Sequence, residues 1–177
     1  MQRVHIINGR VDEGLLAEVF SNEGIGTLVY ANEYQQIRPA KKKDVRAIQL
    51  LTKKAVESDE LVKRTRLVIE KNLGDYYIFE IDKNTVACVA LHVYPEQSKG
   101  ELACLYVNPS HENQGIGRKL IDTCINAARE AGAYRIYLES NSALTPALTL
   151  YRSAGFVDLP PAPTPYARCD VWMELRL

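Results

Sequence analysis

Two periods in the spacing of apolar residues divide most of the chain into expected helices and strands. Apolar positions three and four residues apart predict helices over residues 15–20, 45–55, 64–71, 118–131 and 145–154. Runs rich in β-branched and aromatic residues predict strands over residues 4–7, 27–30, 76–80, 86–94, 101–107, 134–139 and 170–175. From residue 37 the expected order is α, α, β, β, β, α, β, α, β. This order predicts an α/β (α+β) domain with a mixed, mostly antiparallel sheet and helices on both faces.

Residues 1–36 stand apart in this pattern. A short strand, a short helix and a second short strand bury little apolar surface by themselves, so we expect this piece to pack on something else. Residues 37–177 have the length of one ordinary domain. Asp44 is the expected N-cap of the first helix in this domain, because short polar side chains accept the free N–H groups of a helix start.

The composition excludes several classes of protein. Lysine plus arginine and aspartate plus glutamate are each 22 in 177 residues, so the net charge is zero and we expect no nucleic-acid surface. No apolar run approaches the roughly 18 residues of a membrane span, and the first residues do not resemble a signal peptide. We therefore expect a cytoplasmic protein without a membrane partner. The four cysteines are widely spaced and predict free thiols, and no metal site is expected.

The segment Asn113–Gly117 joins an expected strand to a strongly amphipathic expected helix. Gly115 and Gly117 allow the backbone to approach a ligand closely, and the first turn of a helix has four N–H groups without helical partners. These donors, the helix dipole and the neighbouring Arg118 suit a phosphate group. On spacing alone, an anion site and a simple tight turn are equally compatible with the segment. The third glycine of a dinucleotide fingerprint and the Gly-Lys-Ser/Thr of a Walker loop do not occur here.

Several segments of the chain follow one another in an order that is specific to one family. The order is Glu101-Leu-Ala-Cys-Leu-Tyr-Val107, Asn-Pro, Gln114-Gly-Ile-Gly-Arg-Lys-Leu120, Ile136-Tyr-Leu-Glu139 and Leu150-Tyr-Arg-Ser-Ala-Gly-Phe156. Through these segments residues 37–177 resemble the GNAT superfamily of acetyl-CoA-dependent N-acetyltransferases. The resemblance implies the GNAT acyl-CoA N-acyltransferase fold, with acetyl-CoA as the co-substrate.

Within that superfamily, the first two thirds of the chain resemble the N-acetylglutamate synthases. The similar stretches are Gln36-Ile-Arg-Pro39, Leu61-Val-Lys-Arg64 and Gly100-Glu-Leu-Ala-Cys-Leu105. Residues 1–36 resemble the end of the amino-acid-kinase-like domain of those synthases, and we expect a remnant of that domain or an N-terminal extension.

The last third departs from this pattern, so residues 121–177 resemble GNAT enzymes that act on other small molecules. Ser140-Asn-Ser142 and Leu150-Tyr151 replace the usual Thr-Thr-Arg and Trp-Phe segments. Glu112 is a second departure, because arginine or glutamine is usual there.

The resemblance implies that an amine attacks the thioester of acetyl-CoA directly. Glu101 is the expected base, with Glu139 as the competing carboxylate. Tyr151 is the expected acid, because a phenol can donate a proton to the departing thiolate. A backbone N–H near Leu105 to Val107 is expected to bind the oxyanion, where the pantetheine arm lies along the strand. The alternatives are a surface position for Glu101 and a core position for Tyr151.

The resemblance also assigns the remaining site residues. The expected acetyl-CoA contacts are Leu105, Tyr106, Val107, Asn113, Gln114, Gly115, Ile116, Gly117, Arg118 and Asn141. Lys63 and Arg168 are the expected partners of substrate carboxylates, with a plain surface charge as the alternative for each. Cys104 is expected to line the cleft or to pack, and not to act as a nucleophile.

The first expected acceptor is L-glutamate, which implies a role in arginine biosynthesis. Two alternatives stay open, namely an acetyltransferase for another small amine and a non-catalytic acyl-CoA-binding regulatory module. A homodimer is compatible with the sequence.

Overall fold

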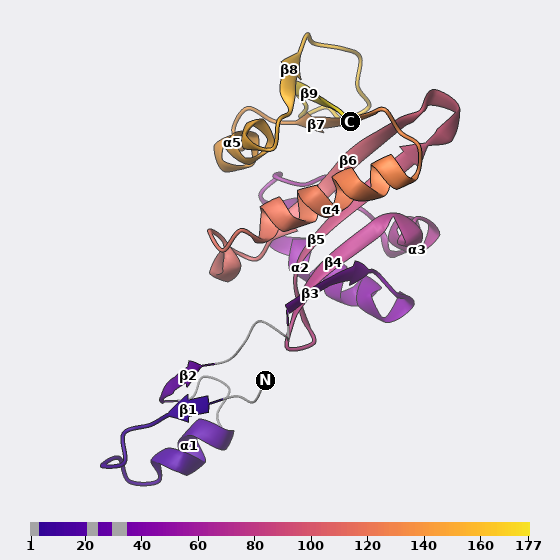
Figure 1. Ribbon diagram of the computed structural model, residues 1–177. Coiled ribbons are helices and arrows are strands. Elements are labelled where there is room, and N and C mark those ends of the chain that lie inside the picture. The colour runs from indigo at the N-terminus through magenta and orange to yellow at the C-terminus, as the bar shows by residue number, and fades with distance from the viewer. Residues whose placement is uncertain (1–3, 21–24, 30–34) are drawn as a thin grey trace. The chain divides into compact units, whose positions relative to one another are not determined.

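The computed structural model describes residues 4–20, 25–29 and 35–177. The chain divides into two compact units, Met1–Gln35 and Gln36–Leu177 (Figure 1). In the smaller unit, strands β1 (Val4–Ile6) and β2 (Thr27–Val29) pair antiparallel. Helix α1 (Gly14–Phe20) lies between these strands in the sequence. Residue 30, the last of the strand predicted over 27–30, lies outside the described residues.

Glu18 joins the helix of the smaller unit to the segment before β2. Its side chain is buried, and its carboxylate accepts the backbone N–H groups of Ile25 and Gly26, both at 2.7 Å. Apolar side chains of α1, including Val19 and Phe20, are exposed. Within the described residues of this unit, the Glu18 contact links α1 to the segment before β2, whereas much of the apolar face of α1 is left exposed.

The larger unit is built on one seven-stranded sheet. Its strands are β3 (Gln35–Pro39), β4 (Tyr76–Ile81), β5 (Asn84–Tyr94), β6 (Lys99–Val107), β7 (Arg135–Ser140), β8 (Val157–Leu159) and β9 (Val171–Arg176). Their order in the sheet is β3-β4-β5-β6-β7-β9-β8. β6 and β7 run parallel, whereas the β4–β5, β5–β6, β7–β9 and β8–β9 ladders are antiparallel.

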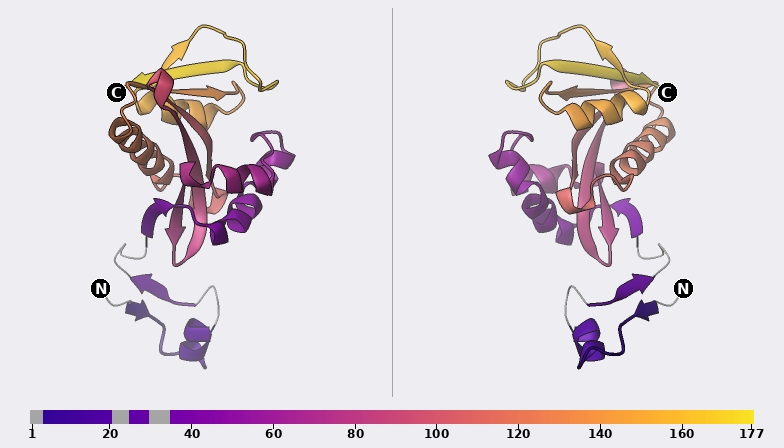
Figure 2. Two further views of the ribbon diagram at one scale, coloured as in Figure 1. Left: turned by 90° about the vertical axis from the view of Figure 1, so that its right-hand side faces the viewer. Right: turned by 90° about the vertical axis from the view of Figure 1, so that its left-hand side faces the viewer.

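Four α-helices cover the two faces of this sheet. They are α2 (Val45–Glu57), α3 (Arg66–Lys71), α4 (Ile116–Glu130) and α5 (Thr145–Ser153). Figure 2 shows α4 on one side of the central strands and α2 and α3 on the other. The predicted fold class, a mixed and mostly antiparallel sheet with helices on both faces, is confirmed.

Each face of the sheet has its own apolar core. On one face α4 turns its buried stripe inward, and Leu120, Ile121 and Cys124 have no exposed surface. On the other face Ile48 of α2 and Tyr76 of β4 belong to a second buried cluster. Burying a side chain of this size stabilises the fold by about 1.5–3 kcal/mol, so the two clusters fix the helices against the sheet.

The sheet splits at its centre, and this split positions the site. β6 and β7 are paired only where Lys99–Glu101 lie beside Arg135–Tyr137. Beyond Glu101 a bulge shifts the register between β5 and β6, and Cys104 adopts a positive φ of 54° there. β7 continues beside β9 instead. The second half of β6 therefore has no strand partner on its β7 side.

Two edge strands were not predicted. β3 ends at Pro39, and every residue of β8 is exposed. Neither strand has room for the alternation of apolar and polar residues that reveals a half-buried strand.

Asp44 occupies the N-cap position of α2 as predicted, but its side chain makes no capping hydrogen bond to the helix. α2 follows a 3-10 turn over Lys42–Asp44, and no side chain caps its N-terminus. The Asp44 carboxylate instead accepts the N–H of Lys41 at 2.8 Å and pairs with Arg38 at 2.7 Å. Arg38 also pairs with Glu80 of β4 at 2.6 Å, and all three side chains are largely buried. The carboxylate serves an ion-pair network that ties β3 and β4 to the turn before α2.

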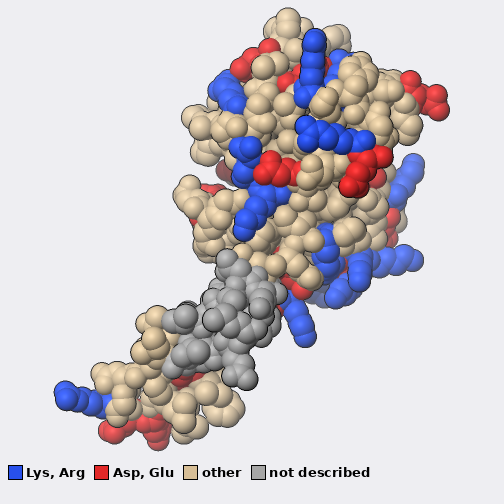
Figure 3. Space-filling model, in the orientation of Figure 1, with Lys and Arg blue, Asp and Glu red and all other residues tan. Residues whose placement is uncertain are grey.

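Charges of both signs cover the outside of the larger unit. Figure 3 shows acidic and basic side chains interspersed over the face that carries α4. Arg118 and Asp122, one turn apart on α4, form an ion pair of 2.9 Å on this face. Among the described residues, no helix is both long enough and apolar enough to cross a membrane.

Candidate functional site

Two cavities lie along the unpaired half of β6. The outer cavity has a volume of about 450 Å³ and extends between the end of β6 and the starts of α4 and α5. The inner cavity has a volume of about 80 Å³ and lies deeper between β6 and β7. Both are lined by Glu60, Leu61, Leu105, Leu144 and Ala147. The two cavities therefore share a wall.

Most of the predicted acetyl-CoA contacts surround the outer cavity. Those that line it are Leu105, Tyr106, Val107, Asn113, Gly115, Ile116, Gly117 and Arg118. Gln114 is exposed and is not part of the lining. Asn141 is also outside the lining, because its side chain holds the backbone around it: its amide donates to the carbonyl of Arg168 and accepts the N–H of Ala143.

The start of α4 presents backbone donors to the outer cavity. Gly115 is the N-cap, with a φ of 74° that favours glycine, and no side chain caps the helix. The first helical hydrogen bond runs from the N–H of Lys119 to the carbonyl of Gly115. The preceding N–H groups have no helical acceptor and lie at the positive end of the helix dipole. This end of the cavity suits an anionic group.

Close packing favours glycine at position 117. A Cβ at this position would lie 2.8 Å from Cδ2 of Leu150 on α5. The absence of a side chain thus lets α4 approach α5 and leaves the backbone open to the cavity.

The side-chain charges near the start of α4 oppose one another. Arg118 is engaged with Asp122 and with the carbonyl of Ser153, to which it donates at 3.0 Å. Glu112, also in the lining, brings a negative charge to the same end. An anion at this place would therefore depend mainly on backbone N–H groups.

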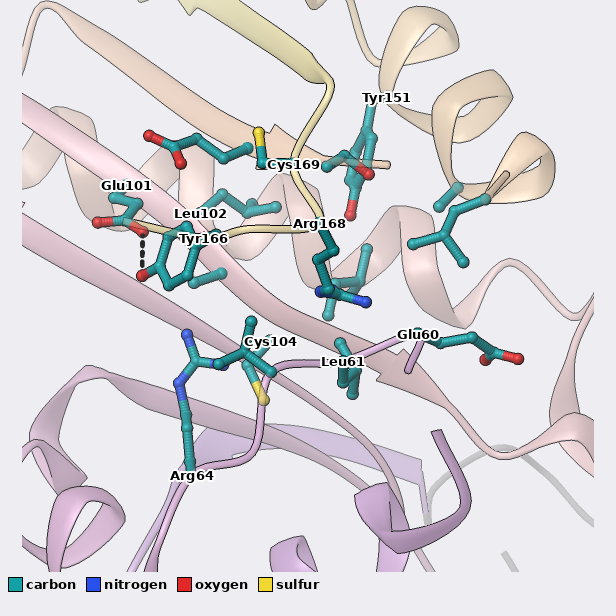
Figure 4. A pocket seen from close by; sticks show the side chains of 17 residues that line it. Glu60, Leu61, Arg64, Glu101, Leu102, Cys104, Tyr151, Tyr166, Arg168 and Cys169 are labelled. Atoms are coloured by element: carbon teal, nitrogen blue, oxygen red, sulfur yellow. Dashed lines mark hydrogen bonds between the residues drawn. The ribbon is translucent and has the colours of Figure 1, made fainter. Parts of the chain in front are cut away.

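Glu101 lies in the wall of the inner cavity and is held by three tyrosines. Its side chain is buried, with 7% exposure. Oε2 accepts hydrogen bonds from the hydroxyl groups of Tyr94, at 2.8 Å, and Tyr137, at 3.0 Å. Oε1 accepts a longer one, 3.4 Å, from Tyr166, as Figure 4 shows. β5, β7 and the loop before β9 thereby orient one carboxylate.

The three tyrosines remain proton donors at neutral pH. Burial and the neighbouring Glu101 carboxylate raise the pKa of Tyr94 to about 12. The same two causes, burial first, raise the pKa values of Tyr137 and Tyr166 above the ordinary value.

Tyr151 of α5 reaches the inner cavity from the opposite side. Its ring is buried and packs against Phe156 with 6.0 Å between ring centroids, while its hydroxyl points into the cavity (Figure 4). Burial raises the pKa of Tyr151 well above its ordinary value, so the phenol stays protonated. Within the described residues the hydroxyl has no hydrogen-bond partner, which leaves its proton available to a ligand.

Two arginines line the inner cavity, and one of them was not predicted. Arg168 enters from the loop before β9 and Arg64 from the segment before α3 (Figure 4). Arg168 donates to the carbonyl of Asp59. Neither arginine forms an ion pair with another described residue. Lys63, predicted to bind substrate, is exposed and lies outside the lining of both cavities.

The position of Arg64 follows from where α3 begins. The predicted helix included Arg64, but the observed helix begins at Arg66, with Thr65 as N-cap. The Thr65 hydroxyl accepts the N–H of Val68 at 3.3 Å. A threonine two residues before the apolar stripe is a typical N-cap signal, and it could have placed Arg64 outside the helix.

Cys104 lines the inner cavity at the bulge of β6, next to a second cysteine. The thiol of Cys88 on β5 donates to the carbonyl of Cys104, with 3.7 Å between sulfur and oxygen. A hydrogen bond from Cys88 and the charge of Arg64 lower the pKa of Cys104 to about 7. By contrast, burial raises the pKa of Cys124 to about 12. All four cysteines are free.

Glu139, the competing carboxylate, also lines the inner cavity. It accepts a hydrogen bond from the hydroxyl of Thr164. Thr164 in turn accepts the N–H of Tyr166 at 3.1 Å, so Glu139 anchors the loop that carries Tyr166 and Arg168. Across the described ranges, no group of three or more His, Cys, Asp or Glu side chains is arranged to hold a metal ion.

Comparison with known proteins identifies a family that this chain matches. Residues 42–156 match the Acetyltransferase (GNAT) family. The chain is 34% identical over 138 residues to an amino-acid acetyltransferase of Photorhabdus laumondii, covering 78% of this chain and 31% of that protein. The chain spans about a third of the length of such curated relatives.

Two solved structures resemble the whole chain. Both are N-acetylglutamate synthase from Neisseria gonorrhoeae at 30% identity. The complex with coenzyme A and N-acetyl-glutamate has a TM-score of 0.74 and covers 100% of this chain and 43% of that chain. The complex with coenzyme A and L-arginine has a TM-score of 0.78, and the match covers 100% of this chain and 41% of that chain.

Proposed function

Since this chain belongs to the acetyltransferase (GNAT) family, we propose that it transfers the acetyl group of acetyl-CoA to the amino group of L-glutamate. One observation carries the proposal: the inner cavity combines a buried carboxylate, a protonated phenol and two arginines without ion-pair partners among the described residues. Arginine guanidinium groups match carboxylates in shape and charge, so an acceptor with two carboxylates suits this set. The gonococcal synthase, crystallised with coenzyme A and N-acetyl-glutamate, supports the same choice.

In this proposal the outer cavity receives acetyl-CoA. The free N–H groups from Ile116 to Arg118 bind the pyrophosphate, and Asn113 and Gly115 shape the turn before them. The pantetheine arm lies along Leu105 to Val107 as an added strand, because its amides can pair with the open edge of β6. The volume of this cavity is in the range of ligand sites.

The amine in the inner cavity then attacks the thioester. Arg64 and Arg168 hold the two carboxylates of the acceptor, and Glu101 takes the proton that the amine loses as the C–N bond forms. A backbone N–H near the bulge binds the oxyanion. When the C–S bond breaks, Tyr151 donates its proton to the thiolate and recovers one from solvent. Acetyl-CoA and glutamate thus become coenzyme A and N-acetyl-glutamate.

We further propose that the smaller unit corresponds to the end of an amino-acid-kinase-like domain, with an N-terminal extension as the alternative. The support for this proposal is that the gonococcal synthase covers the whole chain, residues 1–36 included. A homodimer and a cytoplasmic location are further parts of the proposal, which light scattering and cell fractionation test.

The deciding experiment is a panel of amines assayed by release of free coenzyme A. We expect turnover with L-glutamate, and a loss of about 10²–10⁴-fold in kcat for both Glu101→Gln and Tyr151→Phe, the range of general acid–base catalysis. Thermal unfolding of each variant controls for folding. Tyr151→Phe removes a hydroxyl without a partner in the described structure, so it leaves the fold intact.

The outcomes separate the alternatives. Turnover with a different amine and none with L-glutamate would identify another small-molecule acetyltransferase. Binding of acetyl-CoA without turnover of any amine would identify a non-catalytic regulatory module. Unchanged turnover in a double variant that combines Glu101→Gln with Tyr151→Phe would show that Glu101 and Tyr151 are not the base and the acid.

A further inference from the structure

Two cysteines on neighbouring strands form a thiol pair beside the inner cavity. Cys104 of β6 lines the cavity, whereas Cys88 of β5 has no exposed surface. Both contact the apolar cluster beneath α2, so their side chains lie on the same face of the sheet. The Cys88 sulfur is 3.7 Å from the carbonyl oxygen of Cys104. The proposed acetyl transfer uses neither thiol.

The surroundings of Cys104 favour its thiolate. Cys88 supplies a hydrogen bond and Arg64 a positive charge, and together they lower the pKa of Cys104 to about 7. Cys169, which also lines the cavity, has its pKa raised by burial. Thiolates react with hydroperoxides, and a reactive thiol with a second cysteine nearby is typical of a site that forms a reversible disulfide.

We propose that a hydroperoxide oxidises Cys104, that the oxidised Cys104 then forms a disulfide with Cys88, and that this disulfide closes the acceptor cavity. The Cys104 thiolate attacks the peroxide oxygen, the O–O bond breaks, and a sulfenic acid and hydroxide form. The Cys88 sulfur then attacks the sulfenic sulfur, its proton leaves with the departing hydroxyl as water, and the S–S bond forms. The peroxide is reduced by two electrons, and the two thiols supply them.

The bulge links this bond to the cavity. A disulfide holds its two Cα atoms within about 4.4–6.8 Å, so it restrains β6 where Cys104 already has a positive φ of 54°. It also removes the thiolate beside Arg64. Since misplacement by about 1 Å can slow a reaction by about a hundredfold, we expect a strong loss of acceptor use. This consequence, unlike the oxidation itself, rests on the proposed function.

The test treats the full chain with hydrogen peroxide and maps the products by mass spectrometry. We expect one bond between the peptides of Cys88 and Cys104, seen as the loss of two hydrogens and reversed by dithiothreitol. At pH 7, Cys104 should react at least about fivefold faster than Cys169, because burial raises the pKa of Cys169 and the larger thiolate fraction of Cys104 outweighs its lower intrinsic nucleophilicity. Cys124, with its pKa raised to about 12, serves as an unreactive internal reference.

Three variants separate the steps. Cys88→Ser keeps a donor for the carbonyl of Cys104 but cannot form the bond, so a 1,3-dione probe should trap a sulfenic acid on Cys104. Cys104→Ser should yield neither product. Cys169→Ser, the matched control, should form the disulfide at the parent rate. Circular dichroism checks that each variant is folded, and Cys88→Ala replaces Cys88→Ser if the latter unfolds.

The mass measurement needs no turnover, so it decides the oxidation site even if no acceptor is found. Oxidation of Cys169 before Cys104, or a sulfenic acid on Cys104 that never joins Cys88, would overturn the proposal. Where turnover exists, the disulfide should lower kcat/KM for the acceptor at least about tenfold and leave acetyl-CoA affinity nearly unchanged. Equal use of the acceptor before and after oxidation would refute closure of the cavity.

Discussion

Replacement of Arg64 tests how the inner cavity recognises its acceptor. Arg64→Met keeps most of the side-chain volume and removes the charge. A guanidinium that holds a carboxylate makes two charge-assisted hydrogen bonds, each contributing about 1.5 kcal/mol or more. Their loss raises the barrier by about 3 kcal/mol, which lowers kcat/KM for L-glutamate about 150-fold. The KM for acetyl-CoA should stay nearly constant, because Arg64 does not line the outer cavity.

The neighbouring residue provides a matched control. Lys63 is one residue away and equally cationic, but it is exposed and outside both cavities. We expect Lys63→Met to change kcat/KM by less than about twofold, because it removes only an exposed charge screened by salt. Arg64→Met should also leave the free energy of unfolding within about 0.5 kcal/mol of the parent, since it breaks no ion pair between described residues.

A second acceptor shows which carboxylate Arg64 binds. 2-Aminopentanoate has the carbon chain of glutamate without the side-chain carboxylate. If Arg64 binds that carboxylate, parent and Arg64→Met should use 2-aminopentanoate equally well, so the two changes are not additive. If Arg64 binds the α-carboxylate, the 150-fold loss should persist. A larger loss in Lys63→Met than in Arg64→Met would refute the assignment.

Three further predictions test the cofactor loop and the stability of the fold. Glu112→Gln should lower the KM for acetyl-CoA about threefold at low salt and have little effect at high salt, measured by initial rates, because it removes a negative charge beside the proposed pyrophosphate site. Gly115→Ala should reduce the free energy of unfolding in urea by about 1 kcal/mol, since φ is 74° there, whereas Gly74→Ala, which meets no atom and has no positive φ, should not. Arg38→Met should destabilise the fold by about 3–5 kcal/mol, because it leaves two buried carboxylates unpaired. The Arg38 guanidinium holds the pKa of Asp44 below its ordinary value of 3.8, so this pair stabilises the fold above that pH and the stabilisation is lost as the pH falls below it. Urea unfolding across this range should show an acid dependence in the parent that is weaker in Arg38→Met.

The fold could be predicted where apolar periodicity is long. The stripe of α4 and the run of β5 each extend over several turns or pleats, and both were found to within a few residues. β3 and β8 were not predicted, because short edge strands leave much of their surface to solvent. The ion pair of Asp44 could not be foreseen either, since its partner Arg38, which also pairs with Glu80, is positioned by the pairing of β3 with β4.

The candidate site also has parts that could be predicted from the sequence and parts that could not. Its backbone elements follow from local sequence: the glycines of the α4 turn and the strand that ends in it. Its side-chain network does not, because Tyr94, Tyr137 and Tyr166 converge on Glu101 from segments up to 65 residues away. Such contacts arise only once the register of β5, β6 and β7 is known. Arg64 lies between these cases, since the capping signal of Thr65 was present in the sequence.

The end of the β6–β7 ladder places Glu101 in the wall of the inner cavity, on the strand that also lines the outer cavity. Glu101 is the last residue of β6 that is paired with β7. On its N-terminal side β6 is paired with β7, and on its C-terminal side the backbone N–H and C=O groups of β6 that point away from β5 face no strand. An open edge of this kind accepts an added extended chain, and an acyl pantetheine arm carries amides for such pairing. An arm bound along Leu105 to Val107 would direct its thioester toward the bulge, at the wall shared by both cavities. Because the split of the sheet begins at Glu101, the proposed base lies in the wall of the inner cavity, on the same strand as Leu105 of the wall shared by both cavities.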